Sequence, residues 1–98
     1  MNVIKESSGS QLTLRIQGRL DTTTAPQLET GLKASVGGVT ALVLDLARLA
    51  YISSAGLRVV LMAQKIMNKQ GTMVVRNVDP NVLEVFEVTG FSDILTIE

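Results

Sequence analysis

The chain contains no cysteine, histidine or tryptophan, and its aromatic residues are one tyrosine and two phenylalanines. Without cysteine there is no disulfide, thiolate nucleophile or thiolate zinc site. Without histidine the usual general base and the imidazole metal ligand are both missing. Three aromatic rings are too few for a base-stacking platform. These absences argue against triad chemistry, and they favour a binding module over an enzyme, with no cofactor and no metal.

Charge of one sign and long hydrophobic runs are also lacking. Nine Lys or Arg residues balance nine Asp or Glu residues, so the formal net charge is zero. A neutral chain has no diffuse attraction to phosphate backbones or anionic membranes. The longest apolar runs, such as Val59 to Ala63, are far shorter than the roughly 20 residues that span a bilayer. We expect a cytoplasmic protein with no direct nucleic-acid contact and no membrane span.

What the chain does have is enough apolar material for one core. Its 98 residues are 46% hydrophobic, which suits a single domain over residues 1–98. Gln11–Gln17 alternates polar and apolar residues, as a strand buried on one face does. We expect it to form a hairpin with Val3 and Ile4. Further strands are expected at Ala41–Leu46 and Thr72–Arg76, and a last short one at Ile94–Ile97.

Three helices are expected between these strands, each with explicit start or stop signals. The first runs from about Ala25 to Val36, the second from about Ser54 to Gln70, and the third from Asp79-Pro80 to about Gly90. Alternating strands and helices predict an α/β fold with a small mixed sheet. The right-handed crossover rule places the second helix on one face of that sheet, joining two parallel strands.

The junction Leu49–Arg58, between a central strand and the longest helix, is the most informative stretch. Sites of open α/β sheets lie at such junctions, and the start of a helix accommodates added negative charge. Ser53 and Ser54 are either plain helix caps or regulatory hydroxyls. Gly56 is either a helix-start residue or a gap through which a partner's backbone approaches Ser54. Asp45, late in its strand, is expected to be held by backbone N–H groups.

Gly18–Ala25, Leu42–Leu46 and Tyr51–Leu57 follow one another along the chain, and Gly71–Val75 and Val85–Phe91 come after them. Together, in this order and at similar spacing, these stretches resemble the STAS domain of anti-sigma factor antagonists. The resemblance implies a STAS-like α/β domain whose helices pack mainly on one face. It also implies partner switching: the unphosphorylated protein binds an anti-sigma factor with serine kinase activity, phosphorylation releases it, and a serine phosphatase restores binding.

In that family the modified serine corresponds to Ser54. The preceding aspartate of the family pattern is replaced here by Ser53, which makes Ser53 a rival acceptor. A phosphorylation-independent adaptor or transport-complex subunit is therefore the alternative function. A nucleotide-binding domain has weaker support, because no Gly-rich phosphate loop is present. A monomer or a weak homodimer is expected.

The resemblance also indicates which residues contact the partner. Asp21 matches the loop aspartate that the family uses at the kinase, although aspartate is equally a turn or cap residue. The candidate partner-binding residues, each with a plain structural alternative, are Asp21, Thr22, Thr23, Ser53, Gly56, Leu57 and Arg58.

Overall fold

The computed structural model describes residues 1–98 as a five-stranded sheet with three α-helices and a short 3-10 helix. The strands are β1 (Asn2–Ser8), β2 (Gln11–Leu20), β3 (Ala41–Asp45), β4 (Leu49–Ile52) and β5 (Thr72–Arg76). The helices are α1 (Ala25–Ser35), α2 (Ser54–Asn68) and α3 (Pro80–Val88), and the 3-10 helix is η1 (Phe91–Asp93). All three predicted helices are confirmed, with ends that shift by one or two residues.

The sheet is mixed, as predicted. Its strand order is β1-β2-β3-β5, and β1 runs antiparallel to β2 as the other half of the expected hairpin. The remaining pairs are parallel. Strand β2 is longer than expected and pairs with two strands. Gln11–Arg15 pairs with β3, and Gly18–Leu20 pairs with β4, with a register shift between Gly18 and Arg19.

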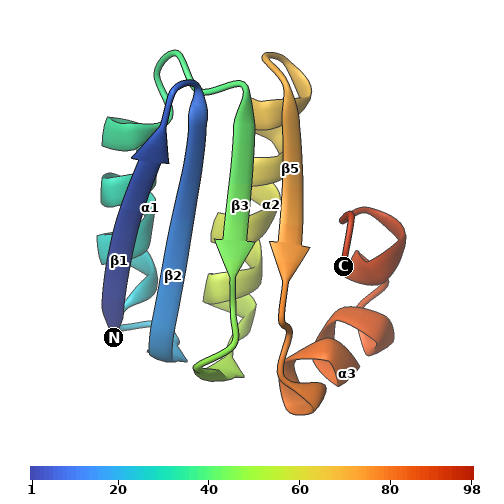
Figure 1. The fold of residues 1–98 in the computed structure, drawn as a ribbon. Coiled ribbons are helices and arrows are strands. Elements are labelled where there is room, and N and C mark those ends of the chain that lie inside the picture. The colour runs from blue at the N-terminus through green and yellow to red at the C-terminus, as the bar shows by residue number, and fades with distance from the viewer.

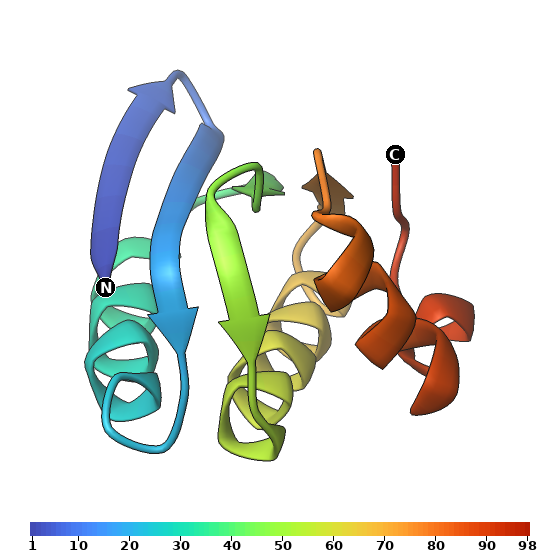
Figure 2. The same cartoon turned by 90° about the horizontal axis from the view of Figure 1, so that it is seen from below.

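Helices α1 and α2 lie side by side on one face of the sheet, and α3 lies beyond β5 near the carboxyl ends of the strands (Figure 1, Figure 2). Between the sheet and the helices, 24 buried residues form one hydrophobic cluster. Leu12, Leu14 and Ile16 supply the inward face of β2, which confirms the predicted alternation. From α3, Phe86 reaches the same cluster and is fully buried.

Two parts of the chain differ from the sequence-based expectation. Strand β4 was not predicted from the sequence. Its two middle residues, Ala50 and Tyr51, are both exposed, so the strand lacks the alternation of buried and exposed residues that is typical of a half-buried strand. The expected strand Ile94–Ile97 is wrong: the chain forms η1 just before it, and only Ile97 makes a parallel bridge, to Val75. The stacking of Phe91 on Phe86, with ring centroids 6.4 Å apart, holds this segment against α3 instead.

No helix in the structure combines the length and the apolar character needed to cross a bilayer. The longest, α2, has 15 residues.

The turn from α2 into β5 generates a stability prediction. A Cβ atom on Gly71 would lie 1.9 Å from the carbonyl oxygen of Thr40, which already accepts a hydrogen bond from Thr72 N at 2.9 Å. We expect Gly71→Ala to lower the free energy of unfolding by about 2 kcal/mol, measured by urea denaturation.

The matched control is Gly31→Ala inside α1, where a Cβ atom meets open space. Removing a helix-interior glycine there is expected to raise the free energy of unfolding by about 1 kcal/mol. Equal effects of the two substitutions would contradict the close approach at Gly71.

Candidate functional site

The carboxyl ends of β2 and β4 and the starts of α1 and α2 meet at one edge of the sheet, at the bottom of Figure 1. The last pair of the β2–β4 ladder is Leu20 with Ile52, and the backbone N–H of Ser53 donates to the Leu20 carbonyl oxygen at 2.9 Å. This bond continues the pairing for one more residue before the chain turns into α2. The junction that the sequence singled out is therefore anchored directly to β2.

Gly56 is the residue that lets α2 sit so close to the sheet. An added Cβ atom would lie 2.7 Å from Leu20 Cγ and 2.9 Å from Ile52 Cγ1, closer than real Cβ contacts allow. The neighbouring Leu57 is only 7% exposed and belongs to the core. Gly56 and Leu57 both face the core of the domain. We therefore assign them a structural role, which is to fix the start of α2, rather than a place on a contact surface.

The two adjacent serines have different environments. Ser53 is the N-cap residue of α2: its backbone is extended, and its side-chain oxygen accepts a hydrogen bond from Gly56 N at 3.3 Å. Ser54 is the first residue of the helix and is exposed. The capping role that the sequence left open between them belongs to Ser53, which leaves the Ser54 hydroxyl at the surface.

The loop after β2 is organised around Asp21. Its Oδ1 accepts hydrogen bonds from the Thr23 hydroxyl at 2.7 Å, from Thr23 N at 3.0 Å and from Thr24 N at 3.2 Å. The Thr24 hydroxyl in turn donates to the Arg19 carbonyl oxygen at 2.9 Å and accepts from Asp21 N. One carboxylate oxygen thus has a structural role, which is the turn-forming alternative stated for Asp21.

These bonds also act on the acidity of the carboxyl group. The hydroxyl of Thr23, more than any other group, lowers the pKa of Asp21 below its ordinary value of 3.8. The backbone N–H groups of Thr23 and Thr24 act in the same direction, because all of them stabilise the ionised form. Asp21 is therefore a fixed negative charge at this edge of the sheet.

A pair of side chains that sequence reasoning missed lies next to Asp21. The guanidinium carbon of Arg19 sits 4.2 Å from the centroid of the Tyr51 ring, and Arg19 Nε is 3.8 Å from Asp21 Oδ2. Tyr51 is 41% exposed. Exposed tyrosine and arginine are the residue types enriched at protein interfaces. The feature of the sequence that could have indicated this pair is Tyr51, the one tyrosine of the chain.

A shallow hollow connects the loop with the two helices. It measures about 300 Å³, and Thr22 and Arg58 line it from opposite sides, together with Pro26, Glu29 and Ala55. Thr22 and Arg58 are both exposed, whereas the hydroxyl of Thr23 is taken up by Asp21. The predicted contact residues Asp21, Thr22 and Arg58 thus share one accessible edge of the domain with Ser54, the predicted acceptor.

Asp45 lies outside this edge and has a structural role, as predicted. Its Oδ1 accepts a hydrogen bond from Ala47 N at 3.0 Å, and its Oδ2 accepts one from Asn77 at 3.2 Å. No group of three acidic side chains is placed to hold a metal ion.

Comparisons with known proteins identify the family. A family model described as "Mlab, STAS domain" matches residues 4–96, nearly the whole chain. The chain is a STAS-domain protein. A Bordetella bronchiseptica protein whose name describes it as an anti-sigma factor antagonist, BtrV, is 42% identical to it over 99% of this chain and 85% of that protein.

Two further relatives extend this result. The anti-sigma-B factor antagonist of Listeria monocytogenes is 31% identical over 97% of this chain and 85% of that protein. The crystal structure of an anti-sigma factor antagonist from Mycobacterium paratuberculosis has the same fold, with a TM-score of 0.89 at 24% identity. That superposition covers 98% of this chain and 83% of the other. This STAS-domain protein therefore belongs to the anti-sigma factor antagonist family.

The separate environments of the two serines predict separate effects on stability. Ser53→Ala removes the capping bond to Gly56 N and is expected to lower the free energy of unfolding by about 1 kcal/mol. Ser54→Ala, at an exposed first-turn position, is expected to change it by less than about 0.5 kcal/mol. Urea denaturation of both variants tests the assignment. If Ser54→Ala were the more destabilising substitution, Ser54 and not Ser53 would be the structural serine.

The hydrogen bonds in the Asp21 loop predict a titration effect. Thr23→Val removes the hydroxyl that contributes most to the lowered pKa, so the pKa of Asp21 is expected to rise toward 3.8. Because folding lowers this pKa, the stabilisation from Asp21 is complete above the unfolded-state pKa and disappears as the pH falls through the folded-state pKa. An NMR titration of the carboxyl carbon measures the shift, and an unchanged pKa in Thr23→Val would contradict the assigned cause.

Proposed function

We propose that this STAS-domain protein binds and inhibits an anti-sigma factor with serine kinase activity, and that phosphorylation of Ser54 ends the binding. The observation that carries this proposal is the division of roles between two adjacent serines. The hydroxyl of Ser53 caps α2, and that of Ser54 stands open at the surface where the helix begins. The names of the relatives from Bordetella and Listeria indicate the class of partner.

The chemistry of the switch is a phosphoryl transfer. The kinase moves the γ-phosphoryl group of ATP to Ser54 Oγ: the bond from the β,γ-bridging oxygen to the γ-phosphorus breaks, a new O–P bond forms, and the hydroxyl proton is lost as ADP leaves. A serine phosphatase reverses the state by hydrolysis, which returns the serine hydroxyl and inorganic phosphate. The STAS domain supplies the acceptor, and the other two proteins supply the catalysis.

The domain itself is expected to tolerate the modification. The start of a helix carries a partial positive charge of about half an electron, which favours an anion at its first residue. Arg58 lies four residues after Ser54, on the same side of α2, where an oppositely charged pair is favourable. Nothing in the core has to move, because Ser54 is exposed.

The partner, in contrast, meets a changed surface. Phosphorylation adds about −1.5 to −2 charges at neutral pH, beside a loop that already holds the ionised Asp21. Docking would then desolvate that charge or place it against like charge. A loss of about 2.7 kcal/mol corresponds to a hundredfold weaker affinity, enough for a switch without any change of fold. Asp21, Thr22 and Arg58 form the contact surface in this proposal.

The alternative function is a phosphorylation-independent adaptor, for instance a transport-complex subunit, docked permanently through the same edge. The observation that favours it is Ser53, which stands where the family pattern has an aspartate. Serine and aspartate cap helices about equally well, so the exchange keeps the cap of α2. The exchange of aspartate for serine removes the negative charge beside the acceptor. That charge has a role only where a kinase uses it to recognise the acceptor serine.

The switch is tested by incubation with the anti-sigma factor kinase of the same cells and ATP, followed by mass-spectrometric site mapping. We expect phosphate on Ser54 alone, and none in the Ser54→Ala variant. Ser54→Asp is expected to weaken binding of the kinase about a hundredfold while leaving the thermal midpoint within about 2 °C. The control is Ser8→Asp, which adds the same charge at an exposed position at the end of β1.

Three outcomes separate the candidates. Phosphate on Ser53 would move the switch to the rival acceptor. Unchanged affinity of both Ser54→Asp and the phosphorylated protein would favour the adaptor. A large fall in the thermal midpoint of Ser54→Asp would show that Ser54 is structural.

A further inference from the structure

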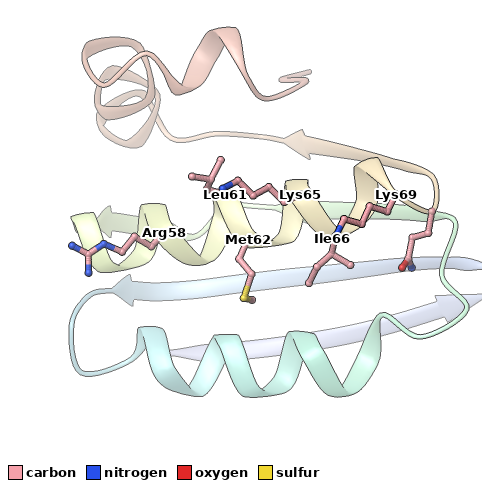
Figure 3. A pocket seen from close by; sticks show the side chains of 7 residues that line it. Arg58, Leu61, Met62, Lys65, Ile66 and Lys69 are labelled. Carbon is pink, nitrogen blue, oxygen red and sulfur yellow. The ribbon is translucent and has the colours of Figure 1, made fainter.

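A second surface of the molecule runs along α2; it shares Arg58 with the proposed switch, which does not explain its other lining residues. A groove of about 390 Å³ runs along the outer side of this helix (Figure 3). Arg58, Leu61, Met62, Lys65, Ile66 and Lys69 line it. From residue 58 to residue 69 the helix rises about 16 Å, roughly three turns.

The base of the groove is apolar. Met62 and Ile66 are partly buried, pack against the hydrophobic core, and point to the same side of α2 in Figure 3. Leu61 is also only partly buried and lies on the other side of the stripe. Met62 and Ile66 pack against the core below them and are still partly accessible, so an apolar side chain of a partner meets a preformed surface.

The rim of the groove carries only positive charge. Arg58, Lys65 and Lys69 are exposed, and none of them takes part in any of the five ion pairs of the chain. Helix α2 contains no Asp or Glu at all. Glu29, which lines the adjoining hollow together with Arg58, is paired with Lys33 at 3.5 Å.

The neutral net charge of the chain conceals this local excess. Residues 77–98 contain no Lys or Arg, and they carry five acidic residues: Asp79, Glu84, Glu87, Asp93 and Glu98. The acidic residues that balance the positive charge of α2 thus lie on the segment that includes α3, and none of them lines the groove.

We propose that this groove binds an acidic amphipathic helix of a partner protein. Its lining residues 58, 62, 65, 66 and 69 follow the spacing i, i+4, i+7, i+8 and i+11, one stripe of a helix. A partner helix laid along the stripe presents apolar side chains to Met62 and Ile66 and carboxylates to the cations. Charge complementarity selects an acidic helix against a basic one.

Other occupants fit these features less well. Membrane-binding basic segments contain about four to eight Lys or Arg residues, and interfacial helices use Trp or Phe. The groove has three cations and no aromatic residue. Single-stranded nucleic acid needs aromatic rings for stacking as well. A second copy could present its acidic α3, reciprocally in a two-fold dimer or head to tail in a ring or filament, and the sedimentation measurement below tests for that occupant.

The proposal does not depend on phosphorylation of Ser54. Lys65 and Lys69 lie about three and four turns along α2 from that residue. The test below uses neither kinase nor nucleotide, so its result and that of the phosphorylation experiment are independent.

The test is an NMR titration of the isotope-labelled full chain with a synthetic peptide. The peptide is about 18 residues long, above the length at which isolated helices are marginal, with Leu along one face and Glu beside it. The reference peptide has Lys in place of every Glu. We expect saturable amide shifts confined to residues 58–70 with the acidic peptide, and none with the basic one.

Charge reversal on the protein completes the design. Lys65→Glu combined with Lys69→Glu is expected to weaken binding of the acidic peptide about tenfold, equal to about 1.4 kcal/mol. The control combines Lys5→Glu with Arg48→Glu, two cations that also lack ion-pair partners but lie outside α2. Thermal midpoints of both double variants verify that they are folded.

Four outcomes would overturn the proposal. They are no saturable shifts with the acidic peptide, equal binding of the two peptides, shifts that map outside α2, and an equal loss of affinity in the control variant. Vesicles with phosphatidylserine and a single-stranded RNA oligomer serve as competing ligands. If either of them shifted the α2 amides and the acidic peptide did not, the groove would be a membrane or nucleic-acid site. Concentration-dependent sedimentation abolished by Lys65→Glu would assign it to a second copy.

Discussion

The close contact between the first turn of α2 and the ends of β2 and β4 sets the geometry of the candidate site. Gly56 leaves no room for a Cβ atom against Leu20 and Ile52, and Ser53 N is bonded to the Leu20 carbonyl oxygen. A helix held this tightly at its start has a fixed rotation about its own axis. That rotation directs Leu57 into the core and Ser54 to the surface. The packing of three apolar residues thereby decides which of two adjacent hydroxyls a partner can reach.

The same edge separates structural from available polar groups. The hydroxyl of Ser53 is taken up by the helix cap, and that of Thr23 by the carboxylate of Asp21. Each such bond stabilises the local backbone, and each makes its donor or acceptor less available to another molecule. The groups that these bonds leave at the surface are the hydroxyl of Ser54 and the exposed Arg19, which stacks on Tyr51 and lies 3.8 Å from the second carboxylate oxygen of Asp21. In the proposed switch, this surface recognises the partner without any change of fold, and one added charge weakens that recognition.

The distribution of charge matters more in this STAS-domain protein than its sum. The formal net charge is zero, which removes long-range attraction to polyanions. Within the fold, however, α2 is purely basic and residues 77–98 are purely acidic. At physiological ionic strength charges are screened beyond about 8 Å, so a partner bound to one helix responds to that helix and not to the molecular total. A chain of 98 residues can therefore carry one surface that favours acidic partners and another that favours basic partners.

The sequence by itself determined the α/β class, the hairpin, the positions of the three helices and the edge at which the candidate site is proposed. These features depend on local signals: the alternation of Leu12, Leu14 and Ile16, the proline at the start of two helices, and the ordered motif around Ser54. Only the tertiary structure decided that β2 pairs with β4 beyond Gly18, that the segment after Phe91 follows α3, and that Ser53 rather than Ser54 caps α2. It also decided that Arg19 stacks on Tyr51 and that three cations share one apolar groove. The physical reason is the sequence distance over which each signal acts. Propensity and periodicity are set by a few neighbouring residues. The features that the sequence did not predict arise from packing between distant segments, or from the rotation that such packing imposes on a helix.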